Sequence, residues 1–220
     1  MAEEGVKKVK LSKMKLYYHP YYRSTRCVWL IKELGVDDEF ELIKIDTMKR
    51  ESAERKEYQK NVHPHGTVPA LVIEGETTLL ESGAICLYLA DKYGRLAPDL
   101  KDRKDYYDWI LHSCATMDEM MEVFYNQWII TPEKPDEELV QKTIKKFLQC
   151  MDALNKTLKG RKFVCGDSLT AADCVLGYSI WGAATMKDGL LVKDYPEVQQ
   201  YYDRLKSRKA FQEAIAETPK

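Results

Sequence analysis

The chain has 220 residues, enough for one large domain or two small ones with a sizeable buried core. Hydrophobic residues make up 45% and charged residues 31%, which is typical of a globular protein and far from a disordered composition. The formal net charge at pH 7 is −1, so no basic excess exists to attract nucleic acid or an anionic membrane. We therefore expect a small molecule or another protein as the partner.

Targeting and membrane signals are not expected in this chain. No segment approaches about 18 consecutive apolar residues, the length at which a membrane span would be predicted. Residues 1–13 are charged and lack the apolar centre of a secretory signal, so we interpret them as a flexible extension. The six cysteines are widely spaced without a C-x-x-C pair, which favours reduced thiols and a cytoplasmic location.

The first part of the chain alternates strand and helix patterns. Residues 14–20 are rich in aromatics and end at a proline, which predicts a short strand. Residues 24–35 repeat apolar side chains at helical spacing and end at Gly35, which suits the end of a helix. A second strand is predicted over 39–46, followed by a polar helix or loop over 50–61.

A hairpin and a helix complete this part. Residues 67–74 and 77–81 predict two strands joined by a Gly-containing turn, and 82–94 predict a helix that ends at Gly94. The order β-α-β-α-β-β-α is that of a thioredoxin-like domain. The helical crossover makes the first two strands parallel, whereas the last two form an antiparallel hairpin.

Beyond residue 94 nearly every segment has a helical period. Residues 94–103 contain Gly, Pro and charges and are expected to form a linker. A long apolar stripe follows until the segment 131–135 breaks it. Further helices are predicted over 136–158, 168–184 and 195–215, the second of them with a capping box from Thr170 to Asp173. We therefore expect α/β plus all-α architecture, with a thioredoxin-like domain over 14–93 and an all-helical domain over 104–220.

Three stretches resemble the cytosolic glutathione transferase family, with a bacterial or theta-like pattern. They are KLYYHPYYRSTRCVWLIKELG (15–35), HPHGTVPALVIEGETTLLESGAICLYLADKYG (63–94) and FVCGDSLTAADCVLGYSI (163–180), in the expected order. The pair V-P-A-L and E-S-x-A-I is the most specific part of the pattern. The resemblance implies glutathione as co-substrate, a homodimer, and the conjugation of glutathione to small hydrophobic electrophiles, as in detoxification.

The resemblance also implies which residues hold glutathione. Val68 precedes a cis Pro69 in the family pattern, and its main chain pairs with the cysteinyl part of glutathione like an added strand. His65 and Thr67 fall in the loop that meets the glycine end, although several classes place Lys or Gln where Thr67 stands. A metal site at His63-Pro-His65 is not expected, because two imidazoles lack a third ligand.

Glu81 and Ser82 match the family's acid–hydroxyl pair. Ser82 at a helix N-terminus suits the γ-glutamyl carboxylate, and Glu81 suits the γ-glutamyl ammonium. The simpler interpretation is that Ser82 caps the helix and Glu81 complements its dipole. Both roles are compatible, since a cap and an anion site use the same atoms.

Three hydroxyls compete to activate the thiol. Tyr22 stands at the serine-class position, which falls at Tyr21 in plant-like variants. Tyr17 stands at the tyrosine-class position, and Ser24 lies two residues beyond Tyr22. Tyr22 is the first choice, Ser24 equally suits the N-cap of the following helix, and Tyr17 also occurs as a packing residue in serine-type members. The family uses this hydroxyl, without a metal, to donate a hydrogen bond to the glutathione sulfur and lower its pKa.

The electrophile pocket is expected between the domains, along the long helix. Its candidate residues are Tyr106, Trp109, Ile110 and Ser113, although an aromatic stripe at helical spacing is more often core.

Two alternative functions stay open. One is glutathione-dependent peroxide reduction or thiol exchange, which the absence of a loop cysteine disfavours, because Cys27 lies inside the helix. The other is a non-catalytic binding or assembly module.

Overall fold

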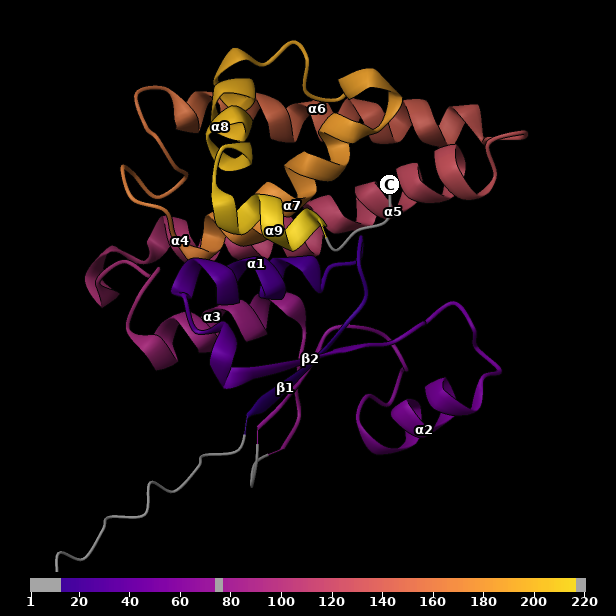
Figure 1. The fold of residues 1–220 in the computed structure, drawn as a ribbon. Helices are drawn as coiled ribbons and strands as arrows, with labels where there is room; N and C mark the ends of the chain where they lie inside the picture. Colours follow the sequence, from indigo (N-terminus) through magenta and orange to yellow (C-terminus); the bar gives the residue numbers. More distant parts are fainter. Residues whose placement is uncertain (1–12, 74–76, 217–220) are drawn as a thin grey trace, which may run out of the picture.

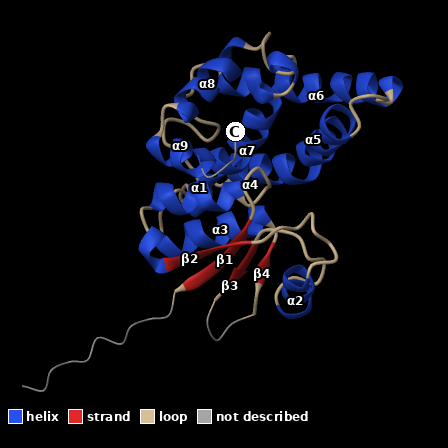
Figure 2. Cartoon of the chain, turned by 45° about the vertical axis from the view of Figure 1, so that its right-hand side comes forward, coloured by secondary structure: helices blue, strands red, loops and turns tan. Residues whose placement is uncertain are grey.

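The computed structural model describes residues 13–73 and 77–216. A four-stranded sheet forms in the order β2-β1-β3-β4 (Figure 2). The strands are β1 (Met14–Tyr18), β2 (Phe40–Lys44), β3 (Ala70–Val72) and β4 (Leu79–Leu80). β1 runs parallel to β2 and antiparallel to β3, and β3 pairs antiparallel with β4, as predicted. The predicted extension, apart from Lys13, and the turn that joins β3 to β4 lie outside the described residues.

Three helices accompany the sheet. They are α1 (Thr25–Leu34), α2 (Ala53–Asn61) and α3 (Ser82–Tyr93). α1 and α3 lie between the sheet and the later helices, while α2 lies away from them (Figures 1 and 2). Gly35 and Gly94 end α1 and α3 with φ of 64° and 59°, the left-handed conformation that glycine adopts without strain. Both predicted helix ends are thus confirmed.

The rest of the chain is helical. The long helix that was predicted consists of α4 (Lys104–Leu111), a π-helical segment (His112–Met117), α5 (Asp118–Tyr125) and a second π-helical segment (Asn126–Ile130). It is followed by α6 (Glu137–Leu158), α7 (Ala171–Thr185), α8 (Pro196–Lys206) and α9 (Lys209–Ala216). Short 3-10 turns span Asp37–Glu39, Leu100–Asp102 and Lys187–Gly189. In the described residues no helix is both long and apolar enough to cross a membrane.

Two predicted elements differ from the structure. In the described residues, the strand expected over 67–74 covers only Ala70–Val72, and it begins after Pro69 because proline has no N–H to donate to a ladder. The last helix, expected over 195–215, is two helices that break between Lys206 and Lys209. Hydrophobic periodicity continues across such a break, so it does not locate the break.

α7 is the central helix of the molecule. It is buried on most of its circumference, as expected for a helix without a polar face. The predicted capping box is present, with the Asp173 carboxylate accepting the Thr170 N–H at 2.8 Å. Gly177 lets α7 approach α1 and α8 closely, because a Cβ there would lie 2.6 Å from Leu205 and 2.9 Å from Trp29. The N-terminal sheet and the helical part therefore share one continuous core.

Candidate functional site

Strand register brings three chain segments to one end of the sheet. Ala70 pairs with Tyr17 of β1 on one side and with Leu80 of β4 on the other. Pro69, which precedes Ala70, and Glu81, which follows Leu80, therefore lie at the same end as the loop that leaves β1. The cis-proline loop, the start of α3 and the loop before α1 thus meet there.

The cis-proline loop is held by α2. The Tyr58 hydroxyl donates to the Thr67 carbonyl at 2.6 Å, and the Val68–Pro69 peptide is cis, as the family pattern implied. Pro69 is buried, Val68 is partly buried, and Thr67 is exposed. The backbone of this loop is thus anchored from behind while part of it stays accessible.

His63 orders the same loop as a neutral imidazole. Its Nδ1 accepts the His65 N–H at 3.2 Å, so the proton belongs on Nε2, which lies 3.0 Å from the Thr67 hydroxyl. Burial and the neighbouring His65 lower the pKa of His63 below its usual value. In the described residues no group of three or more His, Cys, Asp or Glu side chains could hold a metal ion.

The start of α3 differs from the simple cap that was one interpretation. Glu81 is exposed, has φ of 69° and makes no side-chain capping bond, and Ser82 is the first helical residue. The Ser82 hydroxyl instead accepts a hydrogen bond from Arg26 at 3.2 Å. Because Arg26 occupies an oxygen lone pair, the Ser82 O–H proton stays available to donate to another acceptor.

Ser24 occupies the N-cap position of α1, as one interpretation expected, but its side chain does not cap the helix. It is fully buried, already has helical dihedral angles (φ −62°, ψ −23°) and makes no capping bond. Its Oγ donates to the His19 carbonyl at 2.9 Å and accepts the His19 N–H at 3.1 Å. The side chain therefore turns back to close the loop after β1, and its proton is already engaged.

The two tyrosine candidates lie in different surroundings. Side chains alternate along a strand, so Tyr17 faces away from buried Leu16, and its ring centroid lies 5.0 Å from that of Tyr58 on α2. Tyr22 lies in the loop before α1, partly buried, with its ring edge-on to His19 at 4.8 Å. Burial and the nearby Tyr125 raise the pKa of Tyr22, so its hydroxyl is protonated at neutral pH.

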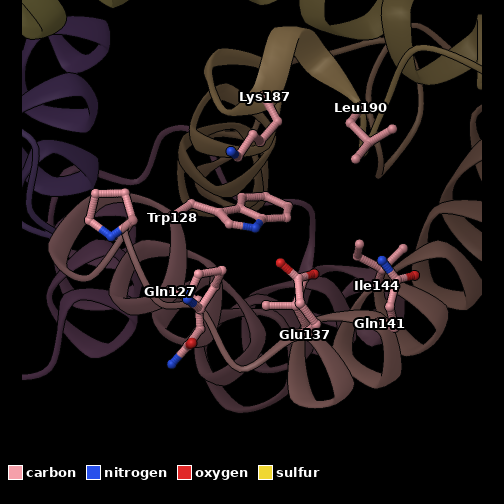
Figure 3. Close-up of a pocket in the computed structure, with 10 residues that line it drawn as sticks. Gln127, Trp128, Glu137, Gln141, Ile144, Lys187 and Leu190 are labelled. Carbon is pink, nitrogen blue, oxygen red and sulfur yellow. The ribbon is translucent and has the colours of Figure 1, made fainter.

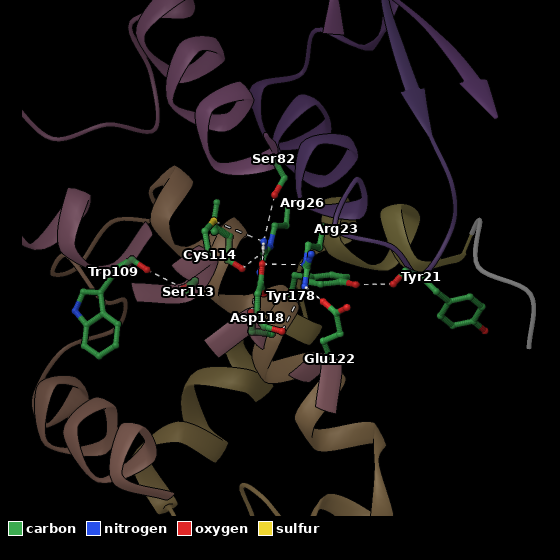
Figure 4. A network of polar contacts seen from close by, with 12 residues as sticks. Tyr21, Arg23, Arg26, Ser82, Trp109, Ser113, Cys114, Asp118, Glu122 and Tyr178 are labelled. Atoms are coloured by element: carbon green, nitrogen blue, oxygen red, sulfur yellow. Dashed lines mark hydrogen bonds and ion pairs between the residues drawn. The ribbon is translucent and has the colours of Figure 1, made fainter. Parts of the chain in front are cut away.

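A buried arginine joins this site to the helical part (Figure 4). Arg26 of α1 is fully buried and forms a bidentate ion pair with Asp118 of α5, at 2.7 and 2.8 Å. It also donates to the Val175 carbonyl at 3.1 Å and the Ser179 hydroxyl at 2.9 Å, both on α7. Burial by itself would lower the pKa of Arg26, but the Asp118 carboxylate outweighs it and raises the pKa.

Most of the residues expected to line the electrophile pocket lie in the core. Tyr106 and Ser113 are fully buried, and Ile110 and Trp109 are 1% and 8% exposed. Their face of the long helix packs against the central helix α7, and of the four only Trp109 also lines a hollow, the one near Lys104 and Arg161. Helical periodicity identifies an apolar face, but it does not distinguish a face buried in the core from one that lines a pocket.

Other aromatic residues lie beside the Tyr22 loop. Tyr21 is 45% exposed and stacks on Trp181 with ring centroids 5.9 Å apart, and Tyr125 is 39% exposed. The Tyr178 hydroxyl donates to the Tyr21 carbonyl at 2.5 Å. The sequence prediction missed these residues, because Trp181 and Tyr178 are distant from Tyr21 in the chain and no local pattern places them beside it.

Two hollows lie elsewhere in the helical part. A cavity of about 210 Å³ is lined by Trp128, Lys187, Glu137 and neighbours between α6 and the end of the long helix (Figure 3). A second hollow of about 430 Å³ lies near Lys104 and Arg161. Neither includes a residue of the cis-proline loop, the start of α3 or the Tyr22 loop. We therefore do not assign either of them to the candidate site.

The family comparisons agree with this geometry. The family model described as glutathione S-transferase, N-terminal domain, matches residues 12–91, and the model for the C-terminal domain matches residues 117–218. Glutathione S-transferase F9 of Arabidopsis thaliana is 28% identical over 211 residues, covering 90% of this chain and 95% of that protein. Glutathione S-transferase PM239X14 of the same plant is 31% identical over 172 residues, covering 73% of this chain and 77% of that protein.

Solved structures share the fold. A glutathione transferase family member from Pseudomonas fluorescens, with two glutathione molecules bound, matches with a TM-score of 0.82 and 23% identity over 94% of each chain. Glutathione S-transferase III in its apo form matches with a TM-score of 0.80 and 25% identity, over 95% of this chain and 98% of the other.

Proposed function

The chain belongs to the cytosolic glutathione transferase family, and on this premise we propose that it conjugates glutathione to small hydrophobic electrophiles. It is a glutathione S-transferase with glutathione as its co-substrate. The observation that carries the finer proposal is the meeting, at one end of the sheet, of the cis-proline loop, the start of α3 and the tyrosine-rich loop before α1.

Glutathione would lie across these three segments. The Val68 main chain would pair with the cysteinyl backbone, and Ser82 with its helix N-terminus would receive the γ-glutamyl carboxylate. The free Ser82 proton supports this role, since its oxygen is already occupied by Arg26. Exposed Glu81 would meet the γ-glutamyl ammonium, and the exposed His65 and Thr67 would meet the glycine end.

Tyr22 is the proposed hydrogen-bond donor to the sulfur. Its phenol carries its proton at neutral pH, as a donor to a thiolate must, and its hydroxyl would turn to the sulfur from its present interactions with Thr47 and Tyr125. A hydrogen bond to an anion contributes about 1.5–3 kcal/mol, which would lower the thiol pKa by about one to two units. Ser24 gives its proton to His19, and the Tyr17 ring is packed against Tyr58 of α2. Both observations favour Tyr22.

The electrophile would approach from the aromatic side of the Tyr22 loop. Tyr21, Tyr125 and Trp181 supply exposed or partly exposed rings there, which suits small apolar compounds. Thiol exchange through Cys27 is not supported, because that thiol is fully buried and burial raises its pKa well above the usual value. Conjugation therefore remains the favoured reaction.

We also propose a homodimer in the cytoplasm, where the six free thiols would remain reduced. The thioredoxin-like domain over residues 14–93 would join the helical domain over 104–220 through the linker 94–103. Sedimentation of the purified protein tests the dimer, because a monomer at micromolar concentration would contradict it.

The experiment that tests the donor compares Tyr22→Phe with Tyr17→Phe and Ser24→Ala. The thiolate absorbance of bound glutathione is titrated for each variant, and conjugation of a chlorinated nitrobenzene is measured. We expect Tyr22→Phe to raise the thiol pKa by about one unit or more and the other two to leave it near the wild-type value. An unchanged pKa in Tyr22→Phe would overturn the assignment. Capture on glutathione resin without any turnover would favour the non-catalytic binding module.

A further inference from the structure

We propose that Asp118 positions two groups of bound glutathione, the cysteinyl thiol and the γ-glutamyl carboxylate, through two arginines. Arg23 links Asp118 to the Tyr22 loop beside the thiol, which is the thiol side. Arg26 links Asp118 to Ser82, which would bind the γ-glutamyl carboxylate, and this is the carboxylate side. This inference rests on the proposed function, because it needs glutathione at the start of α3 and beside Tyr22. It adds Asp118, from the helical part, as a positioning residue that would itself touch neither the thiol nor the γ-glutamyl carboxylate.

The carboxylate side is a rigid chain of contacts. Arg26 grips both Asp118 oxygens, at 2.7 and 2.8 Å, and its Nη1 also donates to Ser82 Oγ at 3.2 Å. The guanidinium is planar and presents its donors in a fixed fork, so the orientation of the carboxylate sets the position of Nη1. Nη1 in turn orients the Ser82 hydroxyl. A small rotation of Asp118 would therefore change the direction of the proton that Ser82 offers.

α7 prevents Arg26 from finding another position. The Nε atom donates to the Val175 carbonyl, Nη2 donates to Ser179 Oγ, and the guanidinium lies 4.9 Å from the Tyr178 ring centroid. Arg26 is fully buried, so no water competes for these donors. Both nitrogens of the fork and Nε are thus engaged.

The thiol side uses the same carboxylate. Arg23 Nε lies 3.0 Å from Asp118 Oδ2, and its Nη2 donates to the Asp118 carbonyl at 3.3 Å. Arg23 directly follows Tyr22 in the chain, so this ion pair anchors the peptide that carries the proposed donor. Tyr178 holds the preceding residue through the Tyr21 carbonyl. The Tyr22 loop is thus fastened to the helical part on both sides (Figure 4).

The thiol side and the carboxylate side differ in the exposure of their arginines, so substitutions can test the two sides separately. The Arg23 side chain is 44% exposed, whereas that of Arg26 is fully buried. Arg23 also lies 3.3 Å from Glu122, whose side chain is 63% exposed. An exposed pair contributes little to stability, so substitution of Arg23 or Glu122 should leave the fold intact.

The test measures glutathione KM, kcat and the pKa of the bound thiol for Arg23→Gln, Arg26→Lys and Asp118→Asn. For Arg23→Gln we expect kcat to fall about three- to tenfold with a raised thiol pKa, and KM to stay within about twofold. For Arg26→Lys we expect KM to rise about tenfold with little change in thiol pKa, because a lysine keeps the charge and loses the fork. Asp118→Asn should show both effects. Glu122→Gln is the matched control and should change neither.

The outcomes separate this inference from the proposed function. If the wild-type protein neither binds glutathione resin nor conjugates, the proposed function fails. If the wild type is active but Arg23→Gln raises KM as much as it lowers kcat, or leaves both unchanged, the inference is wrong. Asp118→Asn leaves the buried Arg26 guanidinium without a charged partner, a loss that can unfold a protein. The soluble Arg23→Gln variant decides the question in that case.

Discussion

Adding one methyl group at Gly177 tests how closely α7 must approach α1. A Cβ there would lie 2.6 Å from Leu205 Cδ1 and 2.9 Å from two ring atoms of Trp29. Trp29 is 1% exposed and Leu205 is fully buried, so neither side chain can move into solvent. Gly177→Ala therefore forces the helices apart or distorts two core rotamers.

The magnitude follows from two opposing effects. Alanine is preferred over glycine inside a helix by about 1 kcal/mol. Overpacking a close-packed core costs about 1–3 kcal/mol and occasionally more, and two rigid neighbours favour the upper part of that range. We expect a net loss of about 1–2 kcal/mol in the free energy of unfolding, which is the upper part of the overpacking cost less the helix preference.

Gly182→Ala in the same helix is the matched control. The nearest atom to its Cβ among the described residues is Met121 Cε at 2.9 Å, the flexible end of a side chain. We expect this variant to be unchanged or more stable by up to about 1 kcal/mol.

The assay is urea unfolding, followed by glutathione kinetics on the folded variants. Residues 175 and 179, which hold Arg26, flank Gly177, so the glutathione KM should also rise in Gly177→Ala. Equal stability of the two alanine variants would refute the reasoning, because only steric contact distinguishes the two positions.

Three further outcomes are expected. The pKa of His63 is lowered in the folded protein, so its contribution to stability is full above pH 6.5 and is lost as the pH falls below that value. The urea midpoints of the wild type should therefore differ between pH 5.5 and pH 7.5. This difference should be smaller in His63→Asn. Asp173 accepts four hydrogen bonds, so Asp173→Asn should lower the free energy of unfolding by about 3–5 kcal/mol in urea titrations, and a loss under about 1 kcal/mol would contradict this. The Tyr106 hydroxyl is buried without a hydrogen-bond partner among the described residues, so Tyr106→Phe should be at least as stable as wild type with unchanged electrophile KM.

Local chemistry allowed much of the fold to be predicted. Gly35 and Gly94 mark helix ends because the left-handed conformation favours glycine, and the Thr170–Asp173 box marks a helix start through hydrogen bonds within four residues. The parallel and antiparallel strand pairs followed from the lengths of the connections. The break before Lys209 was missed, since apolar periodicity runs through it.

The candidate site was predicted less completely, because burial depends on distant segments. Ser24 was a plausible cap by sequence, but its hydroxyl closes a loop onto His19. The face of the long helix that carries Tyr106 and Trp109 was a plausible pocket wall, but it packs against α7. Arg26 interrupts an apolar helix face, and that charge among hydrophobic neighbours was the one available signal of the buried network.

The sequence by itself determined the family, the order of the elements and the residues that meet at the end of the sheet, because motifs and caps depend on neighbours in the chain. The tertiary structure decided the surroundings of each hydroxyl in YYHPYYRSTR, since these depend on strand alternation, on the His19 backbone and on Tyr125. It also decided which cations the Asp118 carboxylate meets, because Arg23 and Arg26 come to it only when the helices pack together. Contacts between residues more than 90 positions apart are set by packing, and no local pattern encodes them.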